Sequence, residues 1–333
     1  MKISSLKLVL TILLFLLAGE LVIRIDKNFN IFGHDTVVQI KEEIRESDEM
    51  TLLKNNSLVF NDQDLRILVL GDSYIFGAEV DYNQNFTHQL KRMLLSENLG
   101  QYKTVYTLDV SRPSNNSLDN YNAYFSFVNR FKPQIVILGY NINDLIDSVK
   151  SIESLSVKNS VELPGKVHEK TSTISRIYNI LYVSDLLQFT LHNTNKFLKS
   201  KGIIIPNSEF DQEISAYYKN KPDWLYSKEI LTRMILDSKA VNSEFIVLLL
   251  PQIDLVKYRK IFSRTDNVIK EFFQQFSNVR FLNLRDSIDV NKAAGYVISR
   301  YDEHPNEKGH QFMAETVNRL IMKELNSKSG VKK

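Results

Sequence analysis

Three side chains in this sequence are of the types that make up a serine nucleophile system. Ser73 follows the apolar run 65–70, in the sequence Gly-Asp-Ser-Tyr-Ile-Phe-Gly, so its hydroxyl is expected at the exit of a buried strand. Asp302 and His304 lie in a polar stretch near the other end of the chain. An imidazole oriented by a carboxylate can take the proton of a hydroxyl, which then attacks an acyl carbonyl. This chemistry requires a fold that brings Ser73 next to His304.

From residue 65 onward, apolar runs rich in β-branched residues alternate with helical patterns. We expect strands at 65–70, 104–110, 134–139, 245–250 and 279–284, and helices at 86–96, 118–131, 224–241, 254–276 and 306–325. Continuous apolar strands separated by helices predict an α/β fold, with a parallel sheet of about five strands covered by helices on both faces.

The carboxyl ends of parallel strands meet at one edge of a sheet, and polar groups that follow strands gather there. Three such groups are expected at this edge: the turn 71–73, the loop 140–144, and the loop that carries Asp302 and His304 before the last helix. The fold rule therefore brings together residues that lie far apart in the sequence.

These segments resemble the sequence blocks of SGNH/GDSL-type hydrolases, a family of esterases and acyl-transfer enzymes. The matching blocks are Gly71-Asp72-Ser73, Asn143-Asp144, and Asp302-Glu303-His304-Pro305-Asn306, and the resemblance spans residues 65 to about 325. It implies a flavodoxin-like three-layer sandwich. It also implies Ser73 as nucleophile, His304 as general base, Asp302 as its orienting acid, and an oxyanion hole that includes the Ser73 N–H and the Asn143 amide.

Two features depart from the family pattern. Only one residue separates Asp302 from His304, where two are usual, so either a shortened turn still lets Asp302 orient His304 or the site works as a Ser-His dyad. The oxyanion glycine expected after the second strand is also absent from the loop 111–117. A backbone N–H of Ser114 or Asn115 can take its place, and we assign this donor to Asn115.

Each of these residues also has an ordinary structural explanation. Ser73 is of a type favoured at helix N-caps, and His304 can be a turn residue before a helix that starts near Pro305. Asp144 is expected to cap the helix that follows it, and His310 to be structural. Asp72 is expected to shape the turn before Ser73.

Composition excludes several classes of function. The chain has no cysteine, which rules out disulfides, thiolate catalysis and cysteine-based zinc sites. A net charge of +3 with no dense basic face argues against a nucleic-acid partner. No histidine spacing typical of zinc is present, so we predict neither a metal nor a cofactor.

The N-terminal residues 1–25 are expected to lie outside the catalytic domain. Lys2 and Lys7 precede an apolar segment at 8–19, as in an export signal. Cleavage after Ala18 or Gly19 would leave a leucine where a small residue is wanted, which fits an uncleaved anchor better than a removed signal. Glu20 would then lie near the membrane interface. We therefore expect a single-pass anchor with the body on the extracytoplasmic side.

The remaining boundaries follow from composition. Residues 26–62 form a polar approach segment with room for one short helix, 63–326 the hydrolase domain, and 327–333 a basic tail. Within the domain, 148–222 is a helical insertion that either covers the site as a lid or packs on the sheet edge, and an apolar stripe at helical spacing favours packing.

The function predicted from these residues is hydrolysis of an acyl ester, plausibly an O-acetyl group on an envelope carbohydrate. The same residues would also serve a polysaccharide O-acyltransferase, since the sequence does not distinguish water from a sugar hydroxyl as the acceptor. A catalytically silent binding or assembly module on the same fold is the alternative from a different class.

Overall fold

The computed structural model describes residues 48–55, 59–142, 144, 218, 222–253, 260, 262–299 and 302–328. The expected membrane anchor at 1–25 lies outside these residues, as does the expected insertion at 148–222 except for Tyr218 and Pro222, and both stay predictions. No helix within the described ranges has the length and apolar character needed to cross a bilayer.

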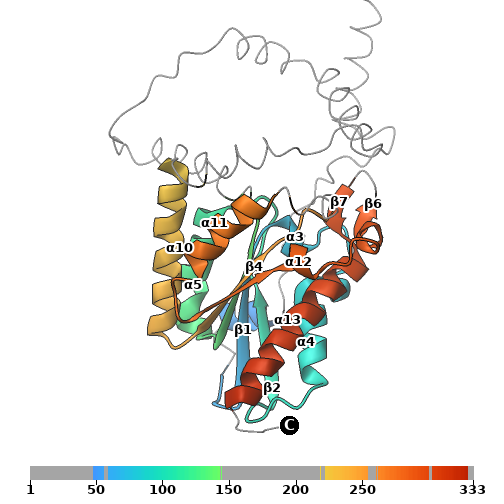
Figure 1. The fold of residues 1–333 in the computed structure, drawn as a ribbon. Coiled ribbons are helices and arrows are strands. Elements are labelled where there is room, and N and C mark those ends of the chain that lie inside the picture. Colours follow the sequence, from blue (N-terminus) through green and yellow to red (C-terminus); the bar gives the residue numbers. More distant parts are fainter. Residues whose placement is uncertain are drawn as a thin grey trace, which may run out of the picture. The chain divides into compact units, whose positions relative to one another are not determined.

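A parallel sheet of five strands forms the centre of the fold, in the order β2-β1-β3-β4-β5 (Figure 1). Its strands are β1 (Asp64–Leu70), β2 (Thr104–Asp109), β3 (Ile135–Tyr140), β4 (Glu244–Leu249) and β5 (Val279–Asn283). All neighbouring pairs are parallel, and the chain order reverses between β1 and β3. This is the flavodoxin-like order, so the predicted fold class is confirmed.

Helices cover both faces of the sheet. The longer ones are α4 (Phe86–Leu95), α5 (Ser117–Phe131), α10 (Pro222–Ala240), α11 (Ser263–Phe273) and α13 (Glu307–Lys328). Helices α4 and α13 pack on one face, and α5, α10 and α11 on the other (Figure 1).

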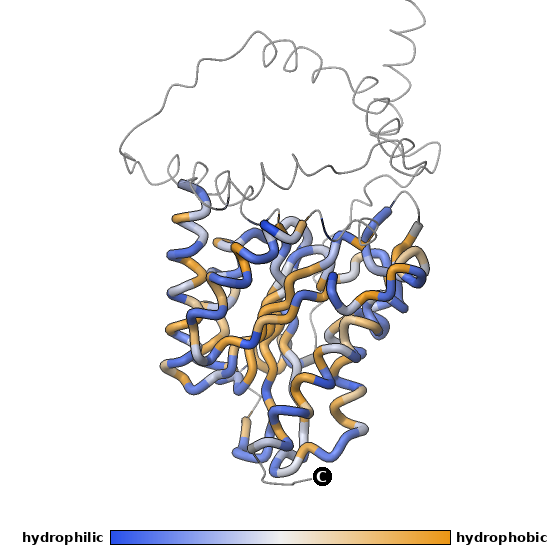
Figure 2. The backbone as a smooth tube through the Cα atoms, viewed as in Figure 1, coloured by the Kyte–Doolittle hydropathy of each residue, from blue (hydrophilic) through white to orange (hydrophobic). Residues whose placement is uncertain are grey.

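Alternate residues of the strands face opposite sides of the sheet, which is why both faces are apolar. Ile67 and Val69 of β1 belong to the cluster under α4 and α13, whereas Leu68 and Leu70 belong to the cluster under α5, α10 and α11. Figure 2 shows the resulting apolar strands between helices whose outer sides are hydrophilic. Burial on both faces explains the continuous apolar runs in the sequence.

The helix ends follow local sequence signals. Asn85 caps α4 by accepting from the His88 N–H, and Asn116 forms a capping box with Asp119 at the start of α5. Within the stretch expected to be a helix at 254–276, α11 begins at Ser263 and ends at Phe273, and Phe262 before it is the N-cap and lies in a 3₁₀ turn. Residues 254–259 and 261 lie outside the described ranges.

A small antiparallel sheet occupies the stretch expected to be a loop before the last helix. It consists of β6 (Val297–Ser299) and β7 (Asp302–Pro305). Asn306 fixes it to α13, because its Nδ2 donates to the Val297 carbonyl oxygen while its Oδ1 accepts from the Gly309 N–H. The prediction of a loop here was wrong, and the strand matters for the site.

Three short helices complete the described fold. These are α2 (Asp48–Lys54), α3 (Ser73–Phe76) and α12 (Leu284–Ser287), and the 3₁₀ turns are Tyr82–Gln84 and Ala293–Gly295. Helix α2 falls in the segment 26–62, and its Met50 and Leu53 are buried in the core beside α5.

Candidate active site

The chain leaves β1 through a tight turn that starts α3 and carries Ser73. Asp72 is the N-cap, and its Oδ1 accepts from the Tyr74 N–H at 2.9 Å. Gly71 allows the turn to lie close to the sheet, because a Cβ there would sit 2.5 Å from Ile75 Cγ1. Gly77 ends α3 in the left-handed conformation, with its N–H donating to the Ser73 carbonyl oxygen. Ser73 therefore stands at the carboxyl end of β1, where the fold rule places it.

The structure brings Ser73, His304 and Asp302 together. Ser73 Oγ lies 3.0 Å from His304 Nε2, and His304 Nδ1 lies 2.7 Å from Asp302 Oδ1. The first residue comes from α3 and the other two from β7, and Figure 1 shows these elements at the same end of the sheet. The arrangement is that of a hydroxyl, a base and an orienting acid in a single hydrogen-bonded chain.

The short spacing between Asp302 and His304 is explained by the strand that carries them. In a β-strand, residues i and i+2 point to the same face, so Asp302 and His304 are neighbours while Glu303 points to the other face. Asp302 Oδ1 also accepts from the His304 backbone N–H at 3.0 Å. The acid is thus held by the same strand as the imidazole that it contacts.

Electrostatics favour the protonated form of His304. The hydrogen bond to Asp302 raises the pKa of His304 above its ordinary value, against the opposing effect of partial burial, and the negative charges of Glu79 and Asp72 add to the rise. The side chains of His304 and Asp302 remain 29% and 36% exposed. The His304 ring is therefore both close to Ser73 and Asp302 and partly exposed.

Asn141 connects the loop after β3 to the turn that carries Ser73. Its Nδ2 donates to Asp72 Oδ2 at 3.3 Å, and its backbone N–H donates to Asp144 Oδ2. Burial raises the pKa of Asp72 to about 6, although the bonds from Tyr74 and Asn141 oppose that rise. Sequence reasoning identified this loop but chose Asn143, which lies outside the described residues. The signal for Asn141 was its position, since it is the first residue after β3.

Of the two backbone N–H groups expected to bind the oxyanion, those of Ser73 and Asn115, only the second already has a hydrogen-bond acceptor within the described residues. Within the described part of the chain, the Ser73 N–H has no hydrogen-bond acceptor. The Asn115 N–H donates to the Arg112 carbonyl oxygen at 3.2 Å, and would have to leave that turn in order to bind an oxyanion. Ser114, the other candidate, has a left-handed backbone with φ of 64°. The assignment of Asn115 stays a prediction.

His310 of α13 packs against Gly77, at the end of the short helix that carries Ser73. It is fully buried, its Nδ1 accepts from the Phe86 N–H at 3.2 Å, and burial lowers its pKa to about 3. A neutral ring that accepts at Nδ1 carries its proton on Nε2. The same Nε2 faces Gly77, where a Cβ would come within 2.6 Å of it. His310 thus ties α13 to α4 and to the end of α3.

Glu79, Asp302 and His304 place one ligand-type atom each within 4.8 Å of one another. Both ring nitrogens of His304 already have hydrogen-bond partners, Ser73 at Nε2 and Asp302 at Nδ1. A metal ion at this position would have to displace one of these bonds, so this donor set fits a proton-transfer site better than a metal site.

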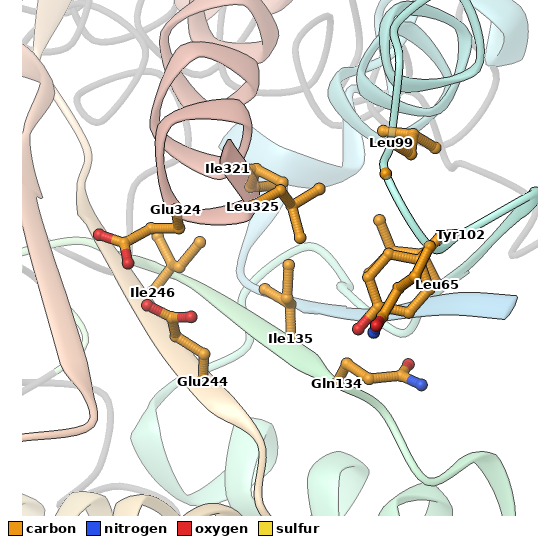
Figure 3. A pocket seen from close by; sticks show the side chains of 12 residues that line it. Leu65, Leu99, Tyr102, Gln134, Ile135, Glu244, Ile246, Ile321, Glu324 and Leu325 are labelled. Atoms are coloured by element: carbon orange, nitrogen blue, oxygen red, sulfur yellow. The ribbon is translucent and has the colours of Figure 1, made fainter. Parts of the chain in front are cut away.

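A separate cavity of about 140 Å³ lies near the amino ends of the strands, at the opposite end of the sheet from Ser73. Figure 3 shows Ile321 and Leu325 of α13 over Ile135 and Ile246, near the amino ends of β3 and β4. The carboxylates of Glu244 and Glu324 at its rim both contact Arg280. This cavity contains none of the residues proposed for catalysis.

No protein-family profile and no curated protein matches the chain, whereas 43 solved chains match it in structure. TesA is 14% identical with a TM-score of 0.44, and the match covers 78% of this chain and 99% of TesA. A putative lipolytic protein of the G-D-S-L family from Desulfitobacterium hafniense DCB-2 is 14% identical, with a TM-score of 0.42 and coverage of 77% and 98%. A catalytic mutant of Axe2, an acetylxylan esterase from Geobacillus stearothermophilus, is 13% identical, with a TM-score of 0.43 and coverage of 77% and 94%.

Proposed function

We propose that this protein is a serine hydrolase of acyl esters, with Ser73 as nucleophile, His304 as general base and Asp302 as the acid that orients it. One observation supports the proposal above all others. Ser73 Oγ lies 3.0 Å from His304 Nε2, although the two residues are 231 positions apart in the sequence, and His304 Nδ1 lies 2.7 Å from Asp302 Oδ1 in the same strand. A capping serine or a turn histidine would not require this alignment.

The reaction follows from these contacts. Ser73 Oγ bonds to the ester carbonyl carbon as its proton passes to His304 Nε2, and the carbonyl electrons move onto the oxygen. Collapse of this intermediate breaks the bond to the leaving alkoxide, which takes the proton from His304. Water then repeats the sequence on the acyl-enzyme and releases the acid. Asp302 holds the ring with Nδ1 protonated, which leaves Nε2 as the acceptor.

The oxyanion is proposed to bind the Ser73 N–H and the Nδ2 group of Asn141. The first donor has no other acceptor within the described residues, and the second is held beside the nucleophile turn by Asp72. Asn143 and Asn115 remain proposed as further donors. Loss of one such donor commonly raises the barrier by about 3 kcal/mol, so replacement of Asn141 should slow the reaction strongly if its amide is the donor.

Hydrolysis is proposed ahead of acyl transfer because water needs no binding site for a second substrate. His304 is 29% exposed, so water can reach the group that must activate it. The proposed substrate is an O-acetyl group on an envelope carbohydrate, and this follows from the family resemblance of the sequence. If a sugar hydroxyl is the acceptor instead, added oligosaccharide will become acetylated faster than free acetate appears.

The same sequence supports a membrane-attached location, with residues 1–25 as the anchor and the body outside the cytoplasm. This location would bring the site to envelope carbohydrate. Extraction of cell membranes at alkaline pH tests it, since an anchored chain stays in the membrane fraction and a cleaved chain is released.

The test of the proposed activity uses the full-length chain in detergent with p-nitrophenyl acetate. We expect wild-type protein to hydrolyse the ester and Ser73→Ala to lose at least about 10³-fold in rate, because the nucleophile is gone. Ser96→Ala, which changes an exposed serine at the end of α4, is the matched control and should keep the wild-type rate. Equal rates for wild type and Ser73→Ala would contradict the proposal and favour a non-catalytic binding module.

A further inference from the structure

A second carboxylate lies next to the imidazole of the proposed site. Glu79 follows α3 by three residues and is exposed. One of its carboxylate oxygens, a carboxylate oxygen of Asp302 and a ring nitrogen of His304 all lie within 4.8 Å of one another. The two acids come from different elements, Glu79 from the nucleophile side and Asp302 from β7.

Glu79 makes no hydrogen bond within the described residues, so its influence on His304 is through charge alone. The ring nitrogens are already bonded to Ser73 and Asp302. A carboxylate held near a second carboxylate is repelled by it unless a cation lies between them. In the proposed reaction that cation is the imidazolium, which forms each time Ser73 or a water gives up its proton.

The acidic groups around His304 all favour its protonated form. The hydrogen bond to Asp302 raises its pKa most, partial burial opposes the rise, and the negative charges of Glu79, Asp302 and Asp72 add to it. His310, packed behind the turn, stays neutral because burial lowers its pKa to about 3. Glu303, on the other face of β7, is not among the groups that act on His304.

We propose that Glu79 is a positioning residue of this site: its carboxylate, on the loop after α3, shares with that of Asp302 the stabilisation of the protonated imidazole of His304. The proposal rests on the assignment of His304 as the general base given above. It gives the imidazolium two negative partners, one bonded at Nδ1 and one through space.

The first test does not need activity. The histidine ring signals of the full-length chain are titrated by NMR in wild type, Glu79→Gln and Glu303→Gln, with the His304 signal assigned from its loss in His304→Gln. We expect the His304 midpoint to fall in Glu79→Gln and to stay at its wild-type value in Glu303→Gln. The fall should shrink in 1 M salt, because an exposed charge acting through space is screened. A wild-type midpoint in Glu79→Gln, or an equal fall in Glu303→Gln, would overturn the proposal.

The second test follows ester hydrolysis against pH in the same variants. Removal of Glu79 lowers the His304 pKa, so more of the base is neutral at acidic pH and the acidic limb of kcat/KM moves to lower pH. The plateau should fall by roughly three- to tenfold, since one unit of lost imidazolium stabilisation corresponds to tenfold. Glu79→Asp, which keeps the charge, should recover part of this loss.

The outcomes separate the two proposals. A wild-type protein with no ester hydrolysis contradicts the proposed function, whatever the NMR titration shows. An active wild type whose pH profile and plateau are unchanged in Glu79→Gln leaves the proposed function intact and refutes the role of Glu79. A merely structural effect of the substitution would lower the rate at all pH values without moving the limb.

Discussion

The carboxylate of Asp302 contacts His304 twice, at the ring and at the backbone. Its Oδ1 lies 2.7 Å from His304 Nδ1 and accepts from the His304 main-chain N–H at 3.0 Å. The two residues share one face of β7, so the orienting acid needs no turn of its own. The choice between a shortened triad and a Ser-His dyad, left open by the sequence, is therefore weighted towards a triad by this geometry.

A prediction at the residue scale separates Asp302 from its neighbour. Asp302→Asn should lower kcat by roughly 10³-fold or more, because an amide at this position favours the wrong tautomer of His304. Glu303→Gln removes the same charge one residue away, on the opposite face of the strand, and should change the rate by no more than a few fold. Steady-state kinetics of the two variants with p-nitrophenyl acetate decide the matter. A larger loss in Glu303→Gln would mean that the orienting acid is misassigned.

At the scale of elements, the site depends on how α3 is held between β1 and α13. Gly71 and Gly139 both face Ile75, where a Cβ on either would come within 2.5 Å of Ile75 Cγ1. At the other end of α3, Gly77 meets the buried ring of His310 from α13. Helix α3, which carries Ser73, can therefore pack this closely only because glycines stand at these three positions.

Two glycines with the same φ allow a controlled test of this packing. Gly77 and Gly100 both have φ of 65°, but a Cβ at Gly77 would lie 2.6 Å from His310 Nε2, whereas one at Gly100 meets nothing within 4 Å. Gly100→Ala should destabilise the fold by about 1 kcal/mol, the usual cost of a left-handed alanine. Gly77→Ala should cost more than this and should also slow ester hydrolysis. Urea denaturation and the hydrolysis rate measure both effects, and equal destabilisation by the two variants would contradict the packing role of His310.

At the scale of the whole molecule, most of the sheet and its order of elements could be predicted from sequence. Buried strands such as β1 and β3 carry continuous apolar runs, and each was placed within one residue of its observed ends. Strand β7 could not be predicted in this way, because Asp-Glu-His-Pro has neither apolar alternation nor β propensity and pairs only with three-residue β6.

The parts of the candidate site that could be predicted are those whose place follows from the order of the strands. Ser73 and His304 follow from the rule that loops meet at the carboxyl edge of a parallel sheet, and the reversal of strand order between β1 and β3 marks the place. The hydrogen-bond partners around Ser73 could not be predicted, because each depends on the local backbone path of one loop. Asn141 bonds to Asp72 through the local path of one loop, and the Asn115 N–H is taken by Arg112 within another.

The central claim is that Ser73 is a nucleophile activated by His304, and covalent labelling tests it most directly. Full-length protein is treated with a fluorophosphonate, which reacts with activated serine hydroxyls, and the modified peptide is identified by mass spectrometry. The account predicts a single adduct on Ser73, absent in Ser73→Ala and formed far more slowly in His304→Gln. A folded protein that leaves Ser73 unmodified, or labels it equally fast without His304, would contradict the account.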